Sequence, residues 1–372
     1  MMIKTEGPSV NIPSYVYCLI PYIHEKLKSE GSASAISLMS NLDLAALPAY
    51  VRGATFESAR TDFHIKGIFG FDSFTNLMKL ELIEHHYDSF ESGLASINRS
   101  FAEGKAVILS GSSYHLPYFS DYHNPWFIDN FGYTINSTMY IVGNHWFSVY
   151  GIDESGVRIY DPIPSKFAGT IPMEDFRLAW GGNGLIAELA HKKDIEKCKA
   201  YGQLNVGVGH IFDQTELNDL FLSTAITTAS LYLKGDKFNL EAEHCWFGHA
   251  ALAEFISDLE QLAGDNRHVQ RIEGCLYSMR VNRYQIGDLL HDMRKLGLIP
   301  QNILDAYLPL HRKWETTYNA FAINMARKKD DLIERTIVLL KEALDMEKHL
   351  FTLLYRYLKG TPFLARSAGR GE

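Results

Sequence analysis

The sequence lacks the features that direct a chain into or through a membrane. It contains no apolar run of about 18 residues, and its start, MMIKTEGPSVNIPSYVYC, has neither the basic beginning nor the unbroken apolar stretch of a signal peptide. We therefore expect a cytoplasmic protein without a membrane partner. The formal net charge is −8, so Lys and Arg are not in excess either. No nucleic-acid partner is therefore predicted.

Cysteine is scarce, and its spacing excludes two kinds of site. The four cysteines, Cys18, Cys198, Cys245 and Cys275, include no Cys-x-x-Cys pair. Neither a zinc ribbon nor a dense disulfide framework is therefore predicted. We expect four free thiols, no metal site and no tightly bound cofactor.

Length and composition favour a folded protein of two domains. A chain of 372 residues is longer than a domain with one hydrophobic core usually is. Its contents of 46% hydrophobic and 22% charged residues are typical of globular domains. Helical and strand-like patterns alternate in the first half, whereas helical periodicity dominates beyond about residue 207. We predict an α+β domain with an antiparallel sheet over residues 1–205, an all-helical domain over 206–360 and a disordered tail over 361–372.

Apolar spacing predicts the individual elements. Residues 80–103 have near-helical spacing and precede Gly104, a suitable C-cap. Short apolar runs in the first half predict strands, and Asp153-Glu154-Ser155-Gly156 predicts a hairpin turn between the last two of them. The predicted strands are 106–111, 139–143, 145–152 and 157–162, and the predicted helices of the second half are Asp213–Lys234, Glu241–Leu262, Val269–Leu296, Pro300–Arg327 and Asp330–Lys359.

The three residue types that thiol chemistry needs occur in the order Cys, His, Asp. Cys18 lies near the start of a predicted helix that either is capped by Ser14 or begins nearer to Leu19, where the positive helix end favours a thiolate. His145 begins a buried strand, and Asp161 ends the next one. Each alone also fits a structural role: a buried small residue, a core histidine or a turn-forming aspartate. Together they match a nucleophile, a base and an orienting carboxylate.

The spacing of His145 and Asp161 constrains the hairpin that carries them. The two residues are 16 positions apart, so a simple four-residue loop at 153–156 would place their side chains on opposite faces of the sheet. We therefore predict an odd loop or a bulge near Gly151 or Gly156. We also predict that the Asp161 carboxylate lies within hydrogen-bond reach of the imidazole.

Other candidate sites are weaker. Cys245 has His244 beside it and His249 four residues on, but sequence neighbours on a helix point in different directions and no third metal ligand is evident. Ser113 lacks the flanking glycines of a nucleophile elbow.

The sequence also resembles a known family, in segments that include two residues of the predicted triad. The segment HWFSVYGIDESGVRIYDP resembles the His strand, hairpin and Asp-Pro of papain-like bacteriocin-processing peptidases and of the butirosin biosynthesis acyltransferase family. EGKAVILSGSSYHLPYF, with its Leu116-Pro117-Tyr118, is similar to a segment of the second family. FGHAALAEFISDLEQL, MRVNRYQIGDLL and Lys313-Trp314 resemble the helical half of the same acyltransferases.

The resemblance implies a papain-like domain followed by a helical domain, and an acyltransferase of natural-product biosynthesis. It implies that Cys18 attacks a thioester presented on the phosphopantetheine arm of an acyl or peptidyl carrier protein, and that the acyl group passes to a small-molecule amine. His145 would deprotonate that amine, Asp161 would orient His145, and backbone N–H groups near Cys18 would stabilise the oxyanion, with Asn11 as a guess for a side-chain donor. The oligomeric state stays open, with a homo-oligomer among the options.

Two other functions fit the same residues. The triad could hydrolyse a peptide or a thioester, which an open cleft without an amine pocket would favour. The chain could instead be a non-catalytic carrier-binding or scaffold protein, which a Cys18 far from His145 would indicate. For transfer, the acidic Glu254, Asp258 and Glu260 could receive a cationic amine, although each also fits a solvated helix face.

Overall fold

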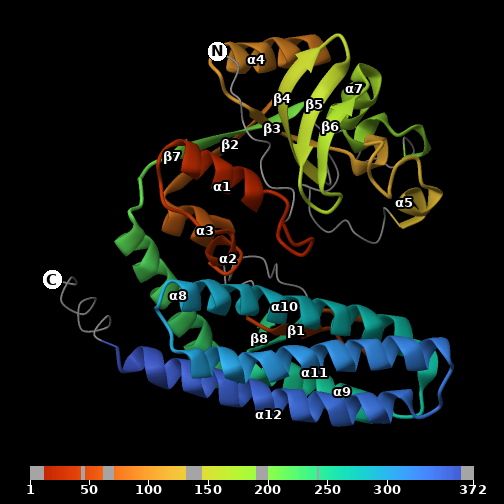
Figure 1. Ribbon diagram of the computed structural model, residues 1–372. Helices are drawn as coiled ribbons and strands as arrows, with labels where there is room; N and C mark the ends of the chain where they lie inside the picture. Colours follow the sequence, from red (N-terminus) through yellow and green to blue (C-terminus); the bar gives the residue numbers. More distant parts are fainter. Residues whose placement is uncertain are drawn as a thin grey trace. The chain divides into compact units, whose positions relative to one another are not determined.

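The computed structural model describes residues 12–42, 47–61, 71–130, 145–189, 200–240 and 243–361. The chain divides into two compact units, one of residues 1–32 and 78–211 and the other of residues 33–77 and 212–372 (Figure 1). Both contain helices and antiparallel strands, so the fold is mixed α+β.

The first unit is built around a six-stranded antiparallel sheet with the strand order β2-β7-β3-β4-β5-β6. Its strands and helices are β2 Leu80–His86, β3 Val107–Gly111, β4 His145–Asp153, β5 Gly156–Asp161, β6 Phe167–Ile171, β7 Gly202–Val208, α1 Ile20–Ser29, α4 Phe90–Ala102, α5 Pro125–Asn130 and α7 Met173–Gly181. Short 3-10 turns complete it: η2 Ser113–His115, η3 Asn183–Leu185 and η4 Ala187–Leu189.

The core of this unit lies on one face of the central strands. Apolar side chains of β3, β4, β5 and β6 pack there against Ile97 of α4 and against Phe176 and Trp180 of α7. Because side chains alternate along a strand, the residues that share this face with Phe147 and Ile159 include His145 and Asp161. The core face therefore ends at the two predicted site residues.

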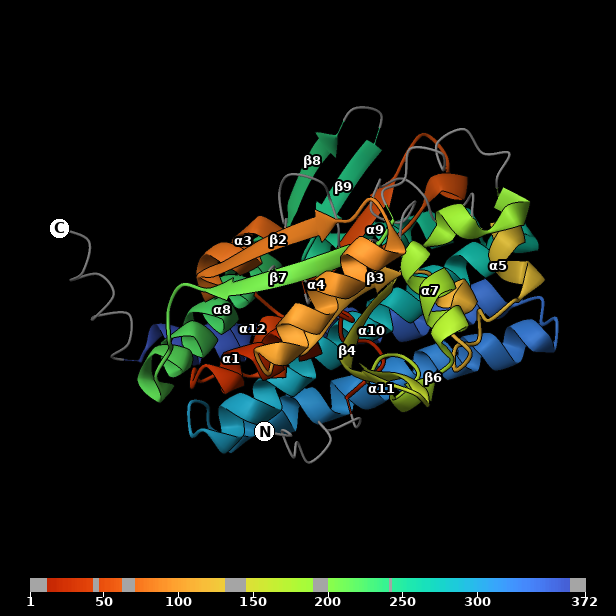
Figure 2. The same cartoon turned by 90° about the horizontal axis from the view of Figure 1, so that it is seen from above.

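The predicted helix over 80–103 is wrong in its first half. Residues Leu80–His86 form the edge strand β2, which pairs with β7 about 120 residues further along the chain (Figures 1 and 2). The helix α4 begins only at Phe90, after Ser89 forms a capping box with Ser92. The spacing of Leu82 and Tyr87 from later apolar residues fits a helix. It does not show that residues 80–86 pair with a strand so distant in sequence.

The second unit consists mainly of long helices, and Figure 1 shows α10, α11 and α12 lying along one another. Its elements are α2 Ile36–Met39, β1 Ala49–Arg52, η1 Phe56–Ser58, α3 Phe71–Met78, α8 Gln214–Lys234, β8 Asp236–Leu240, β9 Glu243–Phe247, α9 His249–Gln261, η6 Asn266–His268, α10 Val269–Lys295, α11 Gln301–Ala326 and α12 Leu332–Lys359. Four of the five predicted helices of the second half are confirmed to within a few residues.

The fifth predicted helix, Glu241–Leu262, is wrong in its first turns. Residues 243–247 form β9, the middle strand of the antiparallel sheet β1-β9-β8, and α9 begins at His249. Gly248, with φ +61°, makes the bend between strand and helix in a conformation that favours glycine. The second unit is consequently not all-helical.

The division of the chain also differs from two contiguous domains that meet at residues 205 and 206. Residues 33–77 group with the C-terminal part, because β1 pairs with β9 and α2 contacts α10. The first unit extends to residue 211. Since β1 and β9 are separated by almost 200 residues, no local sequence pattern predicts their pairing.

Some predictions fall outside the described residues: the strand at 139–143, Cys198, Asn11 and the tail beyond Thr361. Among the described helices, none is long and apolar enough to cross a membrane.

Candidate active site

The hairpin of β4 and β5 contains the predicted irregularity. Asp153 pairs with Gly156, and the register shifts between Val149 and Gly151, so Tyr150 is an extra residue in a β-bulge. Gly156, with φ +132°, closes the turn. Because of the bulge, β5 continues with Asp161 on the same face as His145, and the predicted bulge near Gly151 is confirmed.

His145 and Asp161 are in direct contact at the ends of their strands. His145 Nε2 donates to Asp161 Oδ2 at 2.7 Å, as predicted from the register argument. The exposed fraction is 6% for His145 and 0% for Asp161. A buried carboxylate requires several donors, because its charge has left water.

Two tyrosines supply the other donors to Asp161. Tyr118 donates its hydroxyl to Asp161 Oδ2 at 2.9 Å, the same oxygen that His145 contacts. Tyr22 of α1 shares its one hydroxyl proton between Oδ1 at 3.3 Å and the carbonyl oxygen of Trp146 at 3.1 Å. Burial raises the pKa of both hydroxyls well above the ordinary value, and the charge of Asp161 adds to the rise, so both stay protonated as donors.

Cys18 lies at the N-terminal end of α1. The helix begins at Ile20 with Leu19 as its N-cap and Pro21 in its first turn, so the prediction of a start near Leu19 is confirmed and capping by Ser14 is wrong. Ser14 lies in the preceding turn, where the N–H of Val16 bonds to the carbonyl of Pro13. Cys18 is a free, partly exposed thiol.

The structure brings Cys18 together with His145. Burial alone would lower the pKa of His145, but the charge of Asp161, its hydrogen bond, and a hydrogen bond and charge from Cys18 raise this pKa to about 10. At neutral pH the ring is therefore an imidazolium beside the carboxylate of Asp161. Since Nε2 is engaged with Asp161, Nδ1 is the ring nitrogen that is left for the sulfur.

Aromatic rings pack around these polar groups. Phe119 packs edge-on against His145 with ring centroids 4.6 Å apart, and Tyr118 stacks on Phe167 with centroids 3.9 Å apart. These rings pack directly against the imidazole and Tyr118, and Asp161 behind them is fully buried.

Sequence reasoning missed Tyr22, Tyr118 and Phe119 as parts of this site. A signal for Tyr22 existed, because it lies four residues after Cys18 and thus on the same side of a helix starting there. Tyr118 belongs to the Leu-Pro-Tyr segment, for which the sequence predicts no role in the site, and its hydrogen bond to Asp161 gives that segment one.

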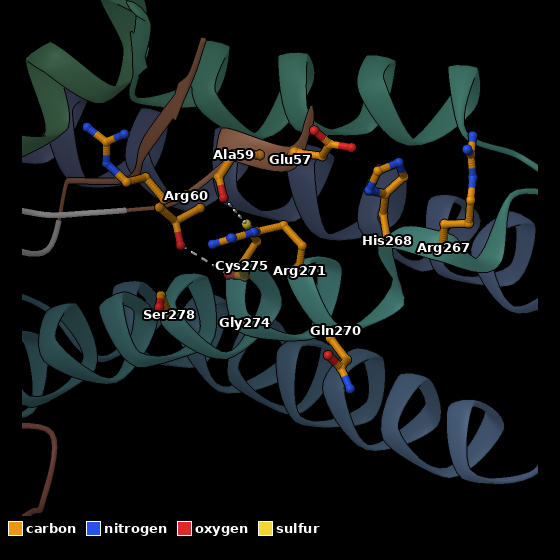
Figure 3. Close-up of a pocket in the computed structure, with 11 residues that line it drawn as sticks. Glu57, Ala59, Arg60, Arg267, His268, Gln270, Arg271, Gly274, Cys275 and Ser278 are labelled. Atoms are coloured by element: carbon orange, nitrogen blue, oxygen red, sulfur yellow. Dashed lines mark hydrogen bonds between the residues drawn. The ribbon is translucent and has the colours of Figure 1, made fainter. Parts of the chain in front are cut away.

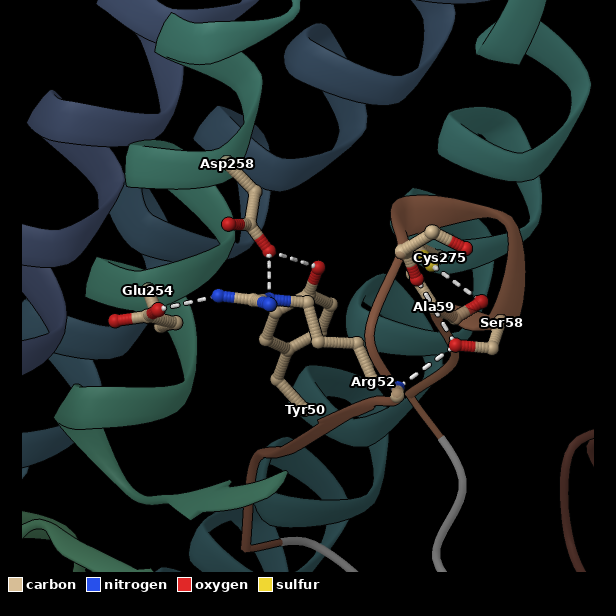
Figure 4. A network of polar contacts seen from close by, with 9 residues as sticks. Tyr50, Arg52, Ser58, Ala59, Glu254, Asp258 and Cys275 are labelled. Carbon is tan, nitrogen blue, oxygen red and sulfur yellow. Dashed lines mark hydrogen bonds and ion pairs between the residues drawn. The ribbon is translucent and has the colours of Figure 1, made fainter. Parts of the chain in front are cut away.

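The acidic residues expected to receive an amine already have cationic partners. In Figure 4, Arg52 lies between Glu254 and Asp258, with 3.2 Å from Nη2 to Glu254 and 2.7 Å from Nε to Asp258. Tyr50 also donates to Asp258 at 2.6 Å, and Glu260 pairs with Lys341 at 2.6 Å. Each of the three carboxylates thus already has a cationic partner within the second unit.

The other candidate residues have structural partners. Cys245 is buried in β9, His244 contacts Asn239 at 2.7 Å, and His249 contacts the carbonyl oxygen of Tyr232 at 2.9 Å. Ser113 donates to Asp121 at 2.6 Å. Within the described part of the chain, no group of three or more His, Cys, Asp or Glu side chains could hold a metal ion.

The constellation around His145 is thus a thiol, an imidazolium and a buried carboxylate held by two tyrosines. Comparison with protein-family models and with curated proteins finds no match to this chain.

Proposed function

We propose that the chain is a papain-like cysteine acyltransferase, which moves an acyl or aminoacyl group from a carrier-protein thioester to an amine. One observation carries the proposal: Cys18, at the start of α1, interacts with a buried His145 whose Nε2 is 2.7 Å from Asp161. The sequence resemblance supports the choice of transfer within the class of cysteine enzymes.

In the first half-reaction the sulfur of Cys18 attacks the carbonyl carbon of the bound thioester. The C–S bond to the pantetheine breaks, and the departing thiolate takes the proton from the His145 imidazolium. Asp161 holds the ring, and backbone N–H groups at the start of α1 are the proposed donors to the oxyanion. The product is an acyl group on Cys18 in thioester linkage.

In the second half-reaction the role of His145 reverses. Acylation ties the sulfur into a thioester, so the contribution of Cys18 to the raised pKa of His145 is lost. The ring is then neutral, because it has given its proton to the departing thiolate. His145 then takes the proton of the attacking amine while the bond between the acyl carbon and Cys18 breaks. Cys18 leaves as a thiolate, and the pair is restored.

A hydrolase remains the second candidate, because Glu254, Asp258 and Glu260, which were expected to receive an amine, are all ion-paired. Water would then attack the same acyl-enzyme. Both functions share the first half-reaction, so the experiment must follow the decay of the intermediate.

The test is intact-protein mass spectrometry after incubation with an acyl-pantetheine thioester. We expect a single acyl adduct that peptide mapping assigns to Cys18, that is absent in Cys18→Ala and that is retained in Cys245→Ala, the matched control. Decay of this adduct would then be compared in buffer and in the presence of polar amines.

Faster decay with formation of an amide would support transfer. Rapid decay that no amine accelerates, together with cleavage of peptide substrates, would establish the hydrolase instead. Absence of any adduct on Cys18 would remove both functions.

A further inference from the structure

A pocket in the second unit lies between residues 57–61 and the start of α10 (Figure 3). Three arginines and three carboxylates surround it: Arg60, Arg267 and Arg271, and Glu57, Glu243 and Asp265. These charges balance, and Asp265 already caps the turn that leads into α10. The pocket therefore indicates neither an anionic nor a cationic ligand.

In the first unit, Tyr118 binds the same oxygen of Asp161 as His145 does. The Tyr118 hydroxyl donates to Oδ2 at 2.9 Å, and His145 Nε2 donates to Oδ2 at 2.7 Å. Tyr22 contacts the other oxygen, Oδ1, at 3.3 Å. Of the two tyrosines, Tyr118 is therefore the one that competes with the imidazole for the negative charge of Oδ2.

Two contacts hold the Tyr118 ring in place. The ring stacks on Phe167 with centroids 3.9 Å apart and an interplanar angle of 3°. Phe167 of β6 lies directly across from Asp161 of β5, and the side chains of such a pair share a face of the sheet. Leu116, two residues before Tyr118, is fully buried in the same core cluster as Phe147. The sheet that carries the carboxylate thus also places the hydroxyl beside it.

The Tyr118 hydroxyl affects how firmly the imidazole holds its proton. The hydrogen of this hydroxyl points at Oδ2, so the positive end of its dipole lies near the charged ring of His145. When the ring loses its proton, Asp161 is left as a buried anion beside a neutral imidazole, and the hydrogen bond from Tyr118 stabilises this state. The hydroxyl therefore lowers the proton affinity of His145, whereas Asp161 raises it.

Other ionisable side chains also lie near His145 and Asp161. Those that the structure describes come from the start of α1, from β5 and from the segment before α5: Cys18, Tyr22, Tyr118 and Tyr160. Burial raises the pKa of all three tyrosine hydroxyls, so they act as dipoles and not as charges. Replacement of one of these tyrosines by Phe therefore removes a hydrogen-bond donor without removing a charge.

We propose that Tyr118 is a positioning residue that acts through Asp161: its hydroxyl shares Oδ2 with the imidazole and thereby eases the release of the His145 proton. In the proposed acyl transfer, on which the catalytic part of this inference rests, His145 gives its proton to the departing thiolate and is neutral when the amine attacks. Both steps pass through a neutral ring beside a buried carboxylate, which is the state that Tyr118 stabilises.

A purely structural role for Tyr118 predicts the opposite effect of its removal. If the hydroxyl served only to hold Asp161 in place, its loss would let the carboxylate move away from His145. The proton affinity of the ring would then fall. The direction of the change thus separates the two roles.

The test is NMR of the imidazole nitrogens in the full chain with labelled histidine, in a Cys18→Ala background. Loss of the thiol removes the contribution of Cys18 to the pKa of His145, as acylation does. The signals of His145 are those that disappear in His145→Gln, and the fraction of imidazolium is followed as the pH rises. We expect Tyr118→Phe, which keeps the ring on Phe167, to bind this proton about threefold more tightly or better.

Two further variants complete the comparison. Tyr22→Phe should raise the proton affinity of His145 less than Tyr118→Phe does, because Tyr22 contacts the other oxygen and shares its proton with the carbonyl of Trp146. Tyr122→Phe is the matched control and should change nothing, because its hydroxyl contacts Asp175 at 3.4 Å. An unchanged or lower proton affinity in Tyr118→Phe, or a rise no larger than in Tyr22→Phe, would overturn the proposal.

A second measurement connects the effect to the reaction. With the acyl group on Cys18, decay in the presence of a polar amine at neutral pH should be about threefold slower in Tyr118→Phe than in wild type, because less of the ring is neutral. Equal decay rates would overturn the role of Tyr118 in the reaction. The NMR comparison needs no acyl group, so it decides how Tyr118 affects His145 even if no adduct forms and the proposed acyl transfer fails.

Discussion

Asp161 is the residue on which the candidate active site depends. It is fully buried, and it accepts hydrogen bonds from His145, Tyr118 and Tyr22. These three donors replace the water that the carboxylate loses on folding, which makes a buried charge tolerable at this place. The same carboxylate raises the pKa of His145, so one residue links the folding of the sheet to the protonation of the candidate base.

The reactivities of the thiols follow from their surroundings. Burial raises the pKa of Cys245, and it raises the pKa of Cys275 to about 12, so both remain protonated at pH 7.5. Cys18 instead is partly exposed and lies next to an imidazolium. We expect iodoacetamide at pH 7.5 to modify Cys18 at least tenfold faster than Cys245 or Cys275, as measured by peptide mass spectrometry.

The dependence on His145 provides the control for this experiment. His145→Ala removes the positive partner, so alkylation of Cys18 should slow by about tenfold or more, while Cys245 and Cys275 should be unaffected. An unchanged rate at Cys18 in this variant would mean that the imidazolium does not activate the thiol.

At the scale of elements, helices were predicted from the sequence far better than strands. The helices α8, α10, α11 and α12 are long, and the apolar spacing that predicts each of them is contained within its own segment. The strands β2 and β9 depend on partners distant in the chain, so their sequences alone resembled parts of helices. His145 and Asp161 could be predicted because they lie on a local hairpin, whereas Tyr22 and Tyr118 reach Asp161 through tertiary packing.

The bulge in β4 can be tested by shortening the strand. Deletion of Tyr150 removes the extra residue of β4, so that Gly151 follows Val149 directly and the strand needs no bulge. Val149 would still pair with Ile159, and Asp161 should therefore stay on the face of His145. We expect the deletion variant to keep a His145-dependent alkylation rate at Cys18 within about threefold of wild type. Tyr150→Ala keeps the bulge but removes the side chain, which is 41% exposed, and is the matched control.

Loss of the His145 dependence in the deletion variant, with retention in Tyr150→Ala, would show that the bulge itself positions Asp161. Equal His145-dependent alkylation rates in the two variants would confirm that the bulge matters only because it places Asp161 on the face of His145.

At the scale of the whole molecule, the chain passes between the two units more than once: residues 33–77 belong to the second unit, and residues 78–211 return to the first. The change to helical periodicity along the sequence predicts where the long helices lie. It does not predict that residues 33–77 fold in the same unit as those helices. That assignment rests on pairings such as Tyr50 with Trp246, which no local pattern reveals.

The second unit has a buried polar centre that joins four of its helices. Glu347 of α12 is fully buried and pairs with Arg283 of α10 at 2.6 and 3.0 Å. Tyr232 of α8 donates to the same carboxylate at 2.8 Å, and Trp314 of α11 donates at 2.7 Å. The polar groups of Arg283, Tyr232 and Trp314 thus all depend on the Glu347 carboxylate.

Removal of this carboxylate should destabilise the second unit strongly. In Glu347→Ala the Arg283 guanidinium is left buried without an anion and the Tyr232 and Trp314 donors lose their acceptor, so we expect the free energy of unfolding to fall by about 3–5 kcal/mol. Glu342→Ala, which removes the exposed partner of Lys313, is the matched control on the same helix and should cost at most about 1 kcal/mol. Urea unfolding, with hydrogen exchange followed separately for peptides of α10–α12 and of β3–β5, gives the readout. A loss in Glu347→Ala no larger than that in Glu342→Ala would contradict the assignment of a shared buried centre.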